Sequence, residues 1–157
     1  MHTHEDFMRE AIRMSVENAK NGKGGPFAAL VVKDGAIIGR GVNRVTATND
    51  PTAHAEVVAI REACTHLGSF QLEGCDIYCS CEPCPMCLGA IYWARPARIF
   101  YANTKEDAAA IDFDDRFIYE EMALPAAQRK LPAVQLLRHE ALEAFRVWAE
   151  NPNKTPY

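Results

Sequence analysis

The sequence contains no run of about 18 apolar residues, so nothing in it predicts a membrane-spanning helix. It also contains no internal repeat, no low-complexity tract and no linker rich in proline and glycine. Its 157 residues are therefore expected to form one domain, 1–157. The first ten residues, MHTHEDFMRE, lack the basic and apolar regions of a secretory signal, which leads us to expect a cytoplasmic protein without a membrane partner.

A concentrated positive charge is also missing. Acidic residues outnumber basic residues by 21 to 17, the formal net charge is −4, and the basic residues are scattered along the chain. Phosphate contacts dominate affinity for nucleic acid, so a protein with that main task usually carries a basic stripe. A nucleic-acid substrate is therefore unexpected.

Cysteine is the residue that the sequence does concentrate, with four in the nine residues CSCEPCPMC, 79–87. In a reducing compartment, C-x2-C spacing indicates metal binding or catalysis before disulfides. The bacterial ferredoxin pattern for an iron–sulfur cluster needs a further cysteine followed by proline, and LGAIYWARP, which comes next, has no cysteine. A metal site here therefore needs a ligand from elsewhere in the chain.

Hydrophobic periodicity and turn residues predict an alternation of helices and strands. Thr3 and Asp6 resemble a capping box, Asp34-Gly35 is typical of a two-residue hairpin turn, and Pro85 suits the first position of a helix. Apolar residues at helical spacing place Phe7, Met8, Ala11, Ile12, Val16 and Ala19 on the buried face of the first helix. The expected elements are helix 3–21, strands 27–33 and 36–43, helix 53–67, strand 75–80, helix 85–94, strand 98–102, short helices and loop over 104–122, strand 133–139 and helix 140–150. This order predicts a three-layer α/β/α sandwich around a mixed five-stranded sheet.

The missing ligand is expected to be a histidine. His54 opens a helix in PTAHAEVVAI, and Glu56, two residues later, points in a different direction, as suits a ligand and a neighbouring acid or base. Cys84 and Cys87 straddle the start of the next helix, where the helix dipole favours the thiolate that binds zinc. These three ligands leave the fourth tetrahedral position to water, which is the mark of a catalytic site. Zinc would lower the pKa of that water to about 7.

A closed structural site is the alternative. Cys79 and Cys81 could join Cys84 and Cys87 in a four-sulfur zinc site, and the protein would then be a non-enzymatic zinc-binding module. Cys79, however, falls on the buried face of its strand with Cys75, where a free cysteine behaves as a small hydrophobe. Cys81 is expected either to pack or to lie beside the ligands.

In the order H-x-E and then P-C-x-x-C, these residues form the signature of zinc-dependent base deaminases. PTAHAEVVAIREA and SCEPCPMCLGAIYWARP resemble the cytidine deaminase superfamily, and in particular the small bacterial guanine deaminases; so do GGPFAALVVKDGAIIGRGVN and FDDRFIYEE. The resemblance implies a cytidine deaminase-like fold, one Zn²⁺ per subunit, and hydrolysis of the small-molecule purine guanine to xanthine and ammonia. Glu56 would carry the proton of the water to the ring nitrogen as general acid and base.

The resemblance also implies a set of pocket residues. Asn43 would hydrogen-bond the base edge, with a turn asparagine as the alternative, and the N–H of Ala55 would face the ring. Phe27 would stack on the purine or belong to the core. Asp115 would handle the leaving amino group, with Asp114 as the second candidate and an exposed loop acid as the alternative.

Two further aromatic residues are implied. Trp93 would lie near the pocket or in the core. Tyr157 would end a C-terminal tail, 151–157, that closes over the pocket of the partner subunit in a swapped homodimer. Pro156 departs from the family's pattern, and an unstructured terminus is the alternative. Other substrates remain open within the same chemistry: the adenosine of a tRNA, cytosine or a triazine.

Overall fold

The computed structural model of this chain describes all of its residues, 1–157. Its internal contacts divide it into two compact units, Met1–Asp115 and Arg116–Tyr157, which are described separately. No helix in either unit combines the length and the apolar character needed to cross a membrane.

The first unit is built on a mixed sheet of four strands. In chain order they are β1 (Ala28–Lys33), β2 (Ala36–Val42), β3 (Asp76–Cys81) and β4 (Arg98–Asn103). Their order across the sheet is β2-β1-β3-β4. β1 pairs antiparallel with both β2 and β3, whereas β3 and β4 are parallel. The predicted Asp34-Gly35 turn joins β1 to β2 with positive φ at both residues, 48° and 78°, as a hairpin turn of this length requires.

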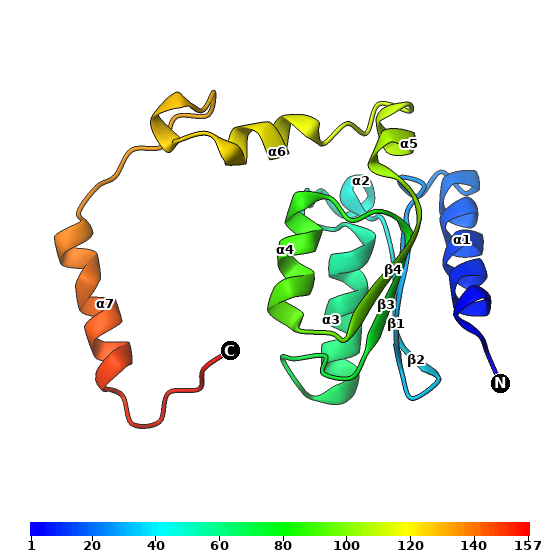
Figure 1. The fold of residues 1–157 in the computed structure, drawn as a ribbon, viewed down its shortest axis with the longest axis horizontal. Helices are drawn as coiled ribbons and strands as arrows, with labels where there is room; N and C mark the ends of the chain where they lie inside the picture. Colours follow the sequence, from blue (N-terminus) through cyan, green and yellow to red (C-terminus); the bar gives the residue numbers. More distant parts are fainter. The chain divides into compact units, whose positions relative to one another are not determined.

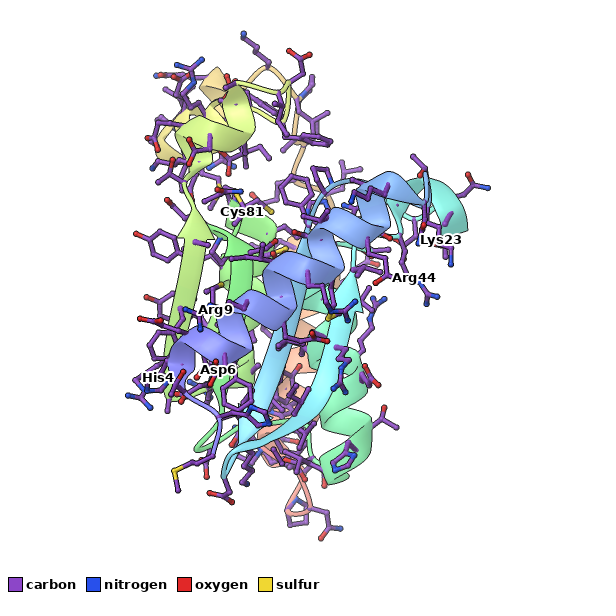
Figure 2. The ribbon with its side chains drawn as sticks, turned by 90° about the vertical axis from the view of Figure 1, so that its right-hand side faces the viewer. His4, Asp6, Arg9, Lys23, Arg44 and Cys81 are labelled. Carbon is purple, nitrogen blue, oxygen red and sulfur yellow. The ribbon has the colours of Figure 1, made fainter.

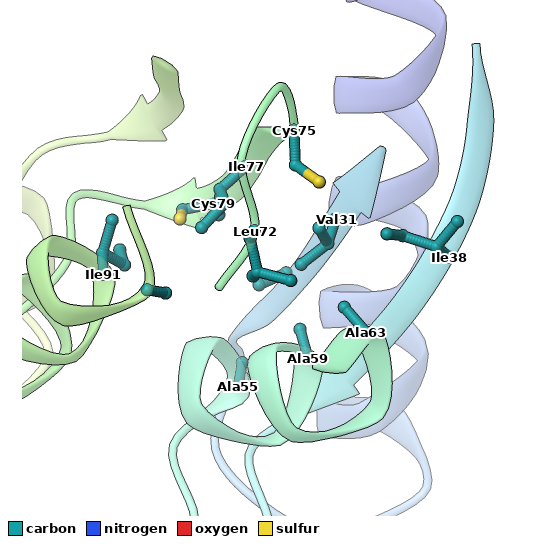
Figure 3. Packing of buried hydrophobic residues seen from close by; sticks show 12 residues of the cluster. Val31, Ile38, Ala55, Ala59, Ala63, Leu72, Cys75, Ile77, Cys79 and Ile91 are labelled. Atoms are coloured by element: carbon teal, nitrogen blue, oxygen red, sulfur yellow. The ribbon is translucent and has the colours of Figure 1, made fainter. Parts of the chain in front are cut away.

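Helices cover both faces of this sheet, which confirms the three-layer α/β/α prediction. Figure 1 shows α1 (His4–Lys20) on one side and α3 (Ala55–Leu67) and α4 (Pro85–Ala94) on the other. The larger core cluster lies between the sheet and α3, as Figure 3 shows, and includes Ile77 and Cys79 from the inner face of β3 and Cys75, which directly precedes that strand. A smaller cluster around Phe7, Leu30 and Tyr78 joins α1 to the other face.

Two glycines of β2 allow α3 to approach the sheet closely. A Cβ atom on Gly39 would lie 2.5 Å from the carbonyl oxygen of Ala59, and one on Gly41 would lie 2.1 Å from that of Ala55. No side chain fits at either position without a shift of the backbone. The start of α3 is therefore held directly against the end of β2.

The expected capping box of α1 is confirmed, since the Thr3 hydroxyl accepts from the backbone of Asp6 and the Asp6 carboxylate accepts from Thr3. Its buried face is only partly as expected. Ile12 and Val16 are 40% and 46% exposed. The buried residues of this helix are Phe7, Ala11, Ser15 and Asn18. Figure 2 shows α1 lying obliquely across the strands.

The remaining elements are short or belong to the second unit. They are α2 (Val45–Thr48) and α5 (Lys105–Ala109) in the first unit, and α6 (Arg116–Ala123), η1 (Ala126–Gln128) and α7 (Arg138–Glu150) in the second. The predicted strand 133–139 is wrong, so the sheet has four strands and not five. The second unit contains no strand with which this segment could pair, and Leu137 has a left-handed φ of 53° that no strand accommodates.

Candidate metal centre and its pocket

The starts of two helices bring His54, Cys84 and Cys87 together. His54 is the N-cap of α3, Cys84 is the N-cap of α4, and Cys87 lies in the first turn of α4. The Nδ1 atom of His54 is 3.5 Å from the Sγ atom of Cys84 and 3.5 Å from that of Cys87. All three ligand atoms lie within 4.8 Å of one another. This is the set of residues expected from the sequence.

The donor set and its spacing fit zinc. Bond lengths of about 2.3 Å to sulfur and about 2.0 Å to nitrogen, at a tetrahedral angle, place a sulfur and a nitrogen ligand roughly 3.5 Å apart. The two Nδ1–Sγ distances, both 3.5 Å, have this value. Three protein ligands complete three corners of a tetrahedron, which leaves one corner for water or substrate.

The thiols of Cys84 and Cys87 have pKa values shifted in opposite directions. Hydrogen bonds from the Cys87 thiol and from His54 lower the pKa of Cys84 well below its usual value. The bond to Cys84, together with burial, raises the pKa of Cys87. Both sulfurs lie at a helix N-terminus, which favours the thiolate form that metals bind, and Cys84 is the thiol whose lowered pKa already favours that form.

The remaining cysteines of CSCEPCPMC do not join this cluster. Cys79 is fully buried within the larger core cluster, and burial raises its pKa well above the ordinary value. Cys81 is 5% exposed, and its Sγ atom lies 3.6 Å from the carbonyl oxygen of Thr104. Burial therefore keeps both groups as neutral thiols, in keeping with the packing role expected for Cys79.

Glu56 lies in the first turn of α3, beside the group formed by His54, Cys84 and Cys87, which we call the metal cluster. Its residue surface is only 6% exposed, and burial is the main cause that raises the pKa of its carboxyl group. The neighbouring Cys87 thiol partly offsets this effect. A carboxyl group with a raised pKa exchanges protons more readily near neutral pH than an exposed glutamate does. The site thus combines a metal cluster with a buried proton carrier.

Asn43 and Ala55 lie at the adjoining ends of β2 and α3. Asn43 directly follows β2 and is 9% exposed, and its Oδ1 atom accepts from the N–H of Val45. It is thus a buried residue that also makes a turn contact. Ala55 is fully buried, and its N–H belongs to the first turn of α3, where helical N–H groups have no intrahelical acceptor.

Phe27 and the acidic pair Asp114-Asp115 are linked through Phe113. Phe27 is partly buried against the larger core cluster, and its ring makes an edge-to-face contact with Phe113, at 5.0 Å between ring centroids. Asp114 and Asp115 follow Phe113 and are half-buried. Burial raises the pKa of Asp115, and the negative charge of Cys84 adds to this shift, so Asp115 lies within electrostatic reach of the metal cluster.

The two outer aromatic residues are more exposed. Trp93 lies on α4 and is 62% exposed, which argues against the alternative of core packing. Tyr157 ends the second unit and is 69% exposed.

Two residues that contact the predicted pocket residues were not expected from the sequence. Phe113 contacts Phe27, and Asn18 of α1 donates to the backbone of Asn43. The signal for Asn18 was a polar residue in helical phase with Phe7, Ala11 and Ser15, the buried face of α1. Phe113 begins the segment FDDRFIYEE, which carries part of the family resemblance, but an aromatic residue in a polar stretch does not identify its partner.

Comparisons with known proteins agree with this geometry. Residues 1–103 match the family model of the cytidine and deoxycytidylate deaminase zinc-binding region. The chain is 54% identical to a guanine deaminase of Bacillus subtilis over 154 residues, which cover 98% of this chain and 99% of the relative. The X-ray structure of a Bacillus subtilis guanine deaminase superposes with a TM-score of 0.96 at 54% identity, covering 99% of both chains.

Two more distant relatives have other ligands or substrates in their names. A tRNA-specific adenosine deaminase of Agrobacterium fabrum is 44% identical over 92 residues, which cover 59% of this chain and 60% of the relative. A mutant protein solved in complex with 8-azaguanine superposes with a TM-score of 0.68 at 33% identity, covering 71% of this chain and 64% of the other.

Proposed function

The chain belongs to the cytidine and deoxycytidylate deaminase family, and we propose that it is a zinc-dependent enzyme that hydrolyses guanine to xanthine and ammonia. The observation that supports guanine as the substrate is the similarity to a guanine deaminase along nearly the whole chain, including the second unit, at 54% identity. The similarity to the tRNA-specific enzyme covers only 59% of this chain.

In this proposal His54, Cys84 and Cys87 hold one zinc ion per subunit, in keeping with their spacing. Zinc held there would supply a water molecule of lowered pKa. Glu56 accepts the proton of this water and delivers it to the ring nitrogen beside the amino-bearing carbon. Its burial supports this role, because a raised pKa allows one carboxyl group to accept and donate within one cycle.

Other residues of the chain bind and orient the purine. The side-chain amide of Asn43 offers both a donor and an acceptor to the base edge, and the N–H of Ala55 faces the ring. Phe27 forms an apolar wall, supported by its contact with Phe113. Asp115 contacts the leaving amino group and exchanges a proton with it, a role that its raised pKa supports. Asp114 is the second candidate for this role.

A substrate panel tests the assignment. We expect the purified protein to release ammonia from guanine with a kcat/KM at least about 100-fold above its values for cytosine, adenine, a triazine and a tRNA that contains the adenosine substrate. A tRNA preference would assign the chain to the editing enzymes, and ammonia release from none of these compounds would contradict the proposal.

We further propose that residues 1–157 act as one deaminase domain and that two copies form a homodimer with swapped tails. The second unit supports this assembly, because its apolar side chains are extensively exposed. Phe145, Leu136 and Leu131 are 75%, 77% and 81% exposed. An apolar surface of this kind is typical of a protein interface. Tyr157 of one copy would close over the pocket of its partner.

Complementation between two inactive copies tests the swapped tail. A Glu56→Gln copy is co-expressed with a copy that lacks Tyr157, under two different affinity tags, and the mixed dimer is isolated. If the tail acts on the partner subunit, the intact tail of the first copy restores turnover at the intact Glu56 of the second, to about half of the wild-type rate per dimer.

The matched control places both changes in one copy and pairs it with a wild-type copy. A swapped tail predicts low turnover for this control, whereas a tail that acts within its own subunit predicts about half of the wild-type rate. If removal of Tyr157 leaves the kinetics of the homodimer unchanged, Tyr157 does not close the pocket.

We also propose that the enzyme acts in the cytoplasm. The structure supports this location, because all six cysteines are free, which suits a reducing compartment.

A further inference from the structure

Asn18 is a buried polar residue at the last turn of α1, on the face of the sheet opposite α3 and α4. It is only 5% exposed. A buried amide in a helix that mainly covers a sheet needs partners for its polar atoms. Its Nδ2 atom finds two of them, and neither belongs to α1.

These two contacts join segments that are distant in the sequence. The Nδ2 atom of Asn18 donates to the carbonyl oxygen of Gly25 at 2.8 Å and to that of Asn43 at 3.1 Å. Gly25 belongs to the loop before β1, and Asn43 directly follows β2. The amide group of Asn18 therefore links the loop before β1 to Asn43, the residue after β2.

The backbone groups of Gly25 and Asn43 also form hydrogen bonds with the backbone of Phe27. The carbonyl oxygen of Gly25 accepts from the N–H of Phe27 at 2.9 Å, and the carbonyl oxygen of Phe27 accepts from the N–H of Asn43 at 3.1 Å. Asn18, Gly25, Phe27 and Asn43 thus form a closed network of hydrogen bonds. We refer to these four residues as the Asn18 network.

The Asn18 network is packed too tightly to shift without cost. A Cβ atom on Gly24 would lie 2.3 Å from the carbonyl oxygen of Asn43 and 3.1 Å from the Nδ2 atom of Asn18. Figure 2 shows Lys23 and Arg44, the chain neighbours of Gly24 and Asn43, at the same end of the first unit. The position of the Asn43 backbone is therefore determined jointly by Asn18 and by the loop.

We propose that Asn18 is a positioning residue for substrate binding, which sets the places of the Asn43 amide and the Phe27 ring in the purine pocket. This inference rests on the proposed function, in which Asn43 and Phe27 contact guanine. Asn18 itself touches neither the substrate nor the metal ligands, and it acts through the two carbonyl groups that it holds.

Replacement of Asn18 is therefore expected to change KM for guanine rather than kcat. Without the Asn18 amide, the buried carbonyl group of Asn43 and the partly buried carbonyl group of Gly25 each lose a donor, and the chain around Asn43 and Phe27 relaxes to find another. The metal cluster and Glu56 are placed by the starts of α3 and α4, so they keep their geometry. Loss of contacts made equally in the ground state and the transition state raises KM and leaves kcat unchanged.

The experiment measures KM and kcat for guanine in Asn18→Asp and Asn18→Ala. The aspartate keeps the size of the side chain but presents an acceptor to two carbonyl oxygens, and the alanine removes the group. We expect KM to rise about tenfold in both, with kcat within about threefold of wild type and one zinc per chain, because a lost hydrogen bond costs about one factor of ten.

Ser15→Ala is the matched control, because Ser15 is also buried on α1 but its hydroxyl donates only within the helix, to Ile12. We expect no change in its KM. A merely structural role for Asn18 would lower the yield or the melting temperature and leave the KM of the surviving enzyme unchanged, since KM does not depend on the active fraction.

An unchanged KM in the Asn18 variants, or an equal rise in Ser15→Ala, overturns the proposal. If neither Asn18 variant folds, Gly24→Ala decides, because its Cβ would meet both the Asn43 carbonyl and the Asn18 amide and so disturb their contact without removing the Asn18 side chain. A tenfold rise in KM supports the positioning role and an unchanged KM contradicts it. Wild-type protein is assayed first. Absence of guanine turnover there defeats the proposed function, and this inference with it, whereas wild-type turnover with unchanged variant KM defeats this inference alone.

Discussion

Glu56→Gln is expected to lower kcat for guanine by about 1,000-fold while the protein keeps one zinc ion per chain. Glutamine has nearly the same shape as glutamate but cannot accept a proton from water, and general acid–base catalysis contributes about 10²–10⁴-fold to rates. Glu56 is not one of the three metal-cluster residues, so its replacement leaves the donor set intact. The measurement is the steady-state rate of guanine loss, with zinc determined by atomic emission on the same sample.

The control for this variant is Glu62→Gln on the same helix. Glu62 is exposed, and its carboxylate accepts from the backbone N–H of Arg40, a contact that a glutamine carbonyl oxygen can also make. Its kcat is expected to stay within twofold of wild type. A Glu56→Gln enzyme that retains a third or more of the wild-type kcat would remove Glu56 from its proposed role.

Cys87→Ala is expected to lose the zinc ion and with it all measurable turnover. Cys87 is fully buried and supplies one of the three ligand atoms, 3.5 Å from His54 Nδ1. With only two protein ligands left, the site cannot retain zinc against a competing chelator. We expect zinc to fall from one ion per chain to below about 0.1 after dialysis against a weak chelator, and Cys84→Ala, at a less buried position, to give the same result.

Cys81→Ala distinguishes the open site from a closed four-sulfur site. The Cys81 sulfur lies against the carbonyl oxygen of Thr104 and outside the metal cluster, so this variant is expected to keep one zinc and most of its activity. Loss of zinc from Cys81→Ala would show that this sulfur binds the metal. The protein would then contain a structural zinc site, contrary to the proposed function.

Local sequence signals predicted most of the first unit. The Asp34-Gly35 turn, the start of α4 at Pro85 and the end of α3 at Gly68 depend on the backbone preferences of single residues, so a reader of the sequence can locate them. The metal cluster was predictable for a related reason. His54, Cys84 and Cys87 lie at the starts of two helices, and metal chemistry limits the residue types that can occupy these positions.

The failures share a physical cause, which is dependence on distant partners. Residues 133–139 have the apolar composition of a strand, but a strand also needs a neighbour for its N–H and C=O groups, and the second unit provides none. Ile12 and Val16 have helical spacing, but the phase of α1 is set by the sheet that it covers. The contact between Asn18 and Asn43 spans 25 residues, and no local pattern encodes it.

The conversion of guanine in water enriched with oxygen-18 tests the central claim most directly. The account predicts that the zinc-loaded protein forms one ammonia for each xanthine and that each xanthine carries one heavy oxygen at the carbon that lost its amino group. Removal of zinc should stop the reaction, and its return should restore it. Unchanged guanine in the presence of fully zinc-loaded protein, or xanthine without the heavy oxygen, would contradict the account.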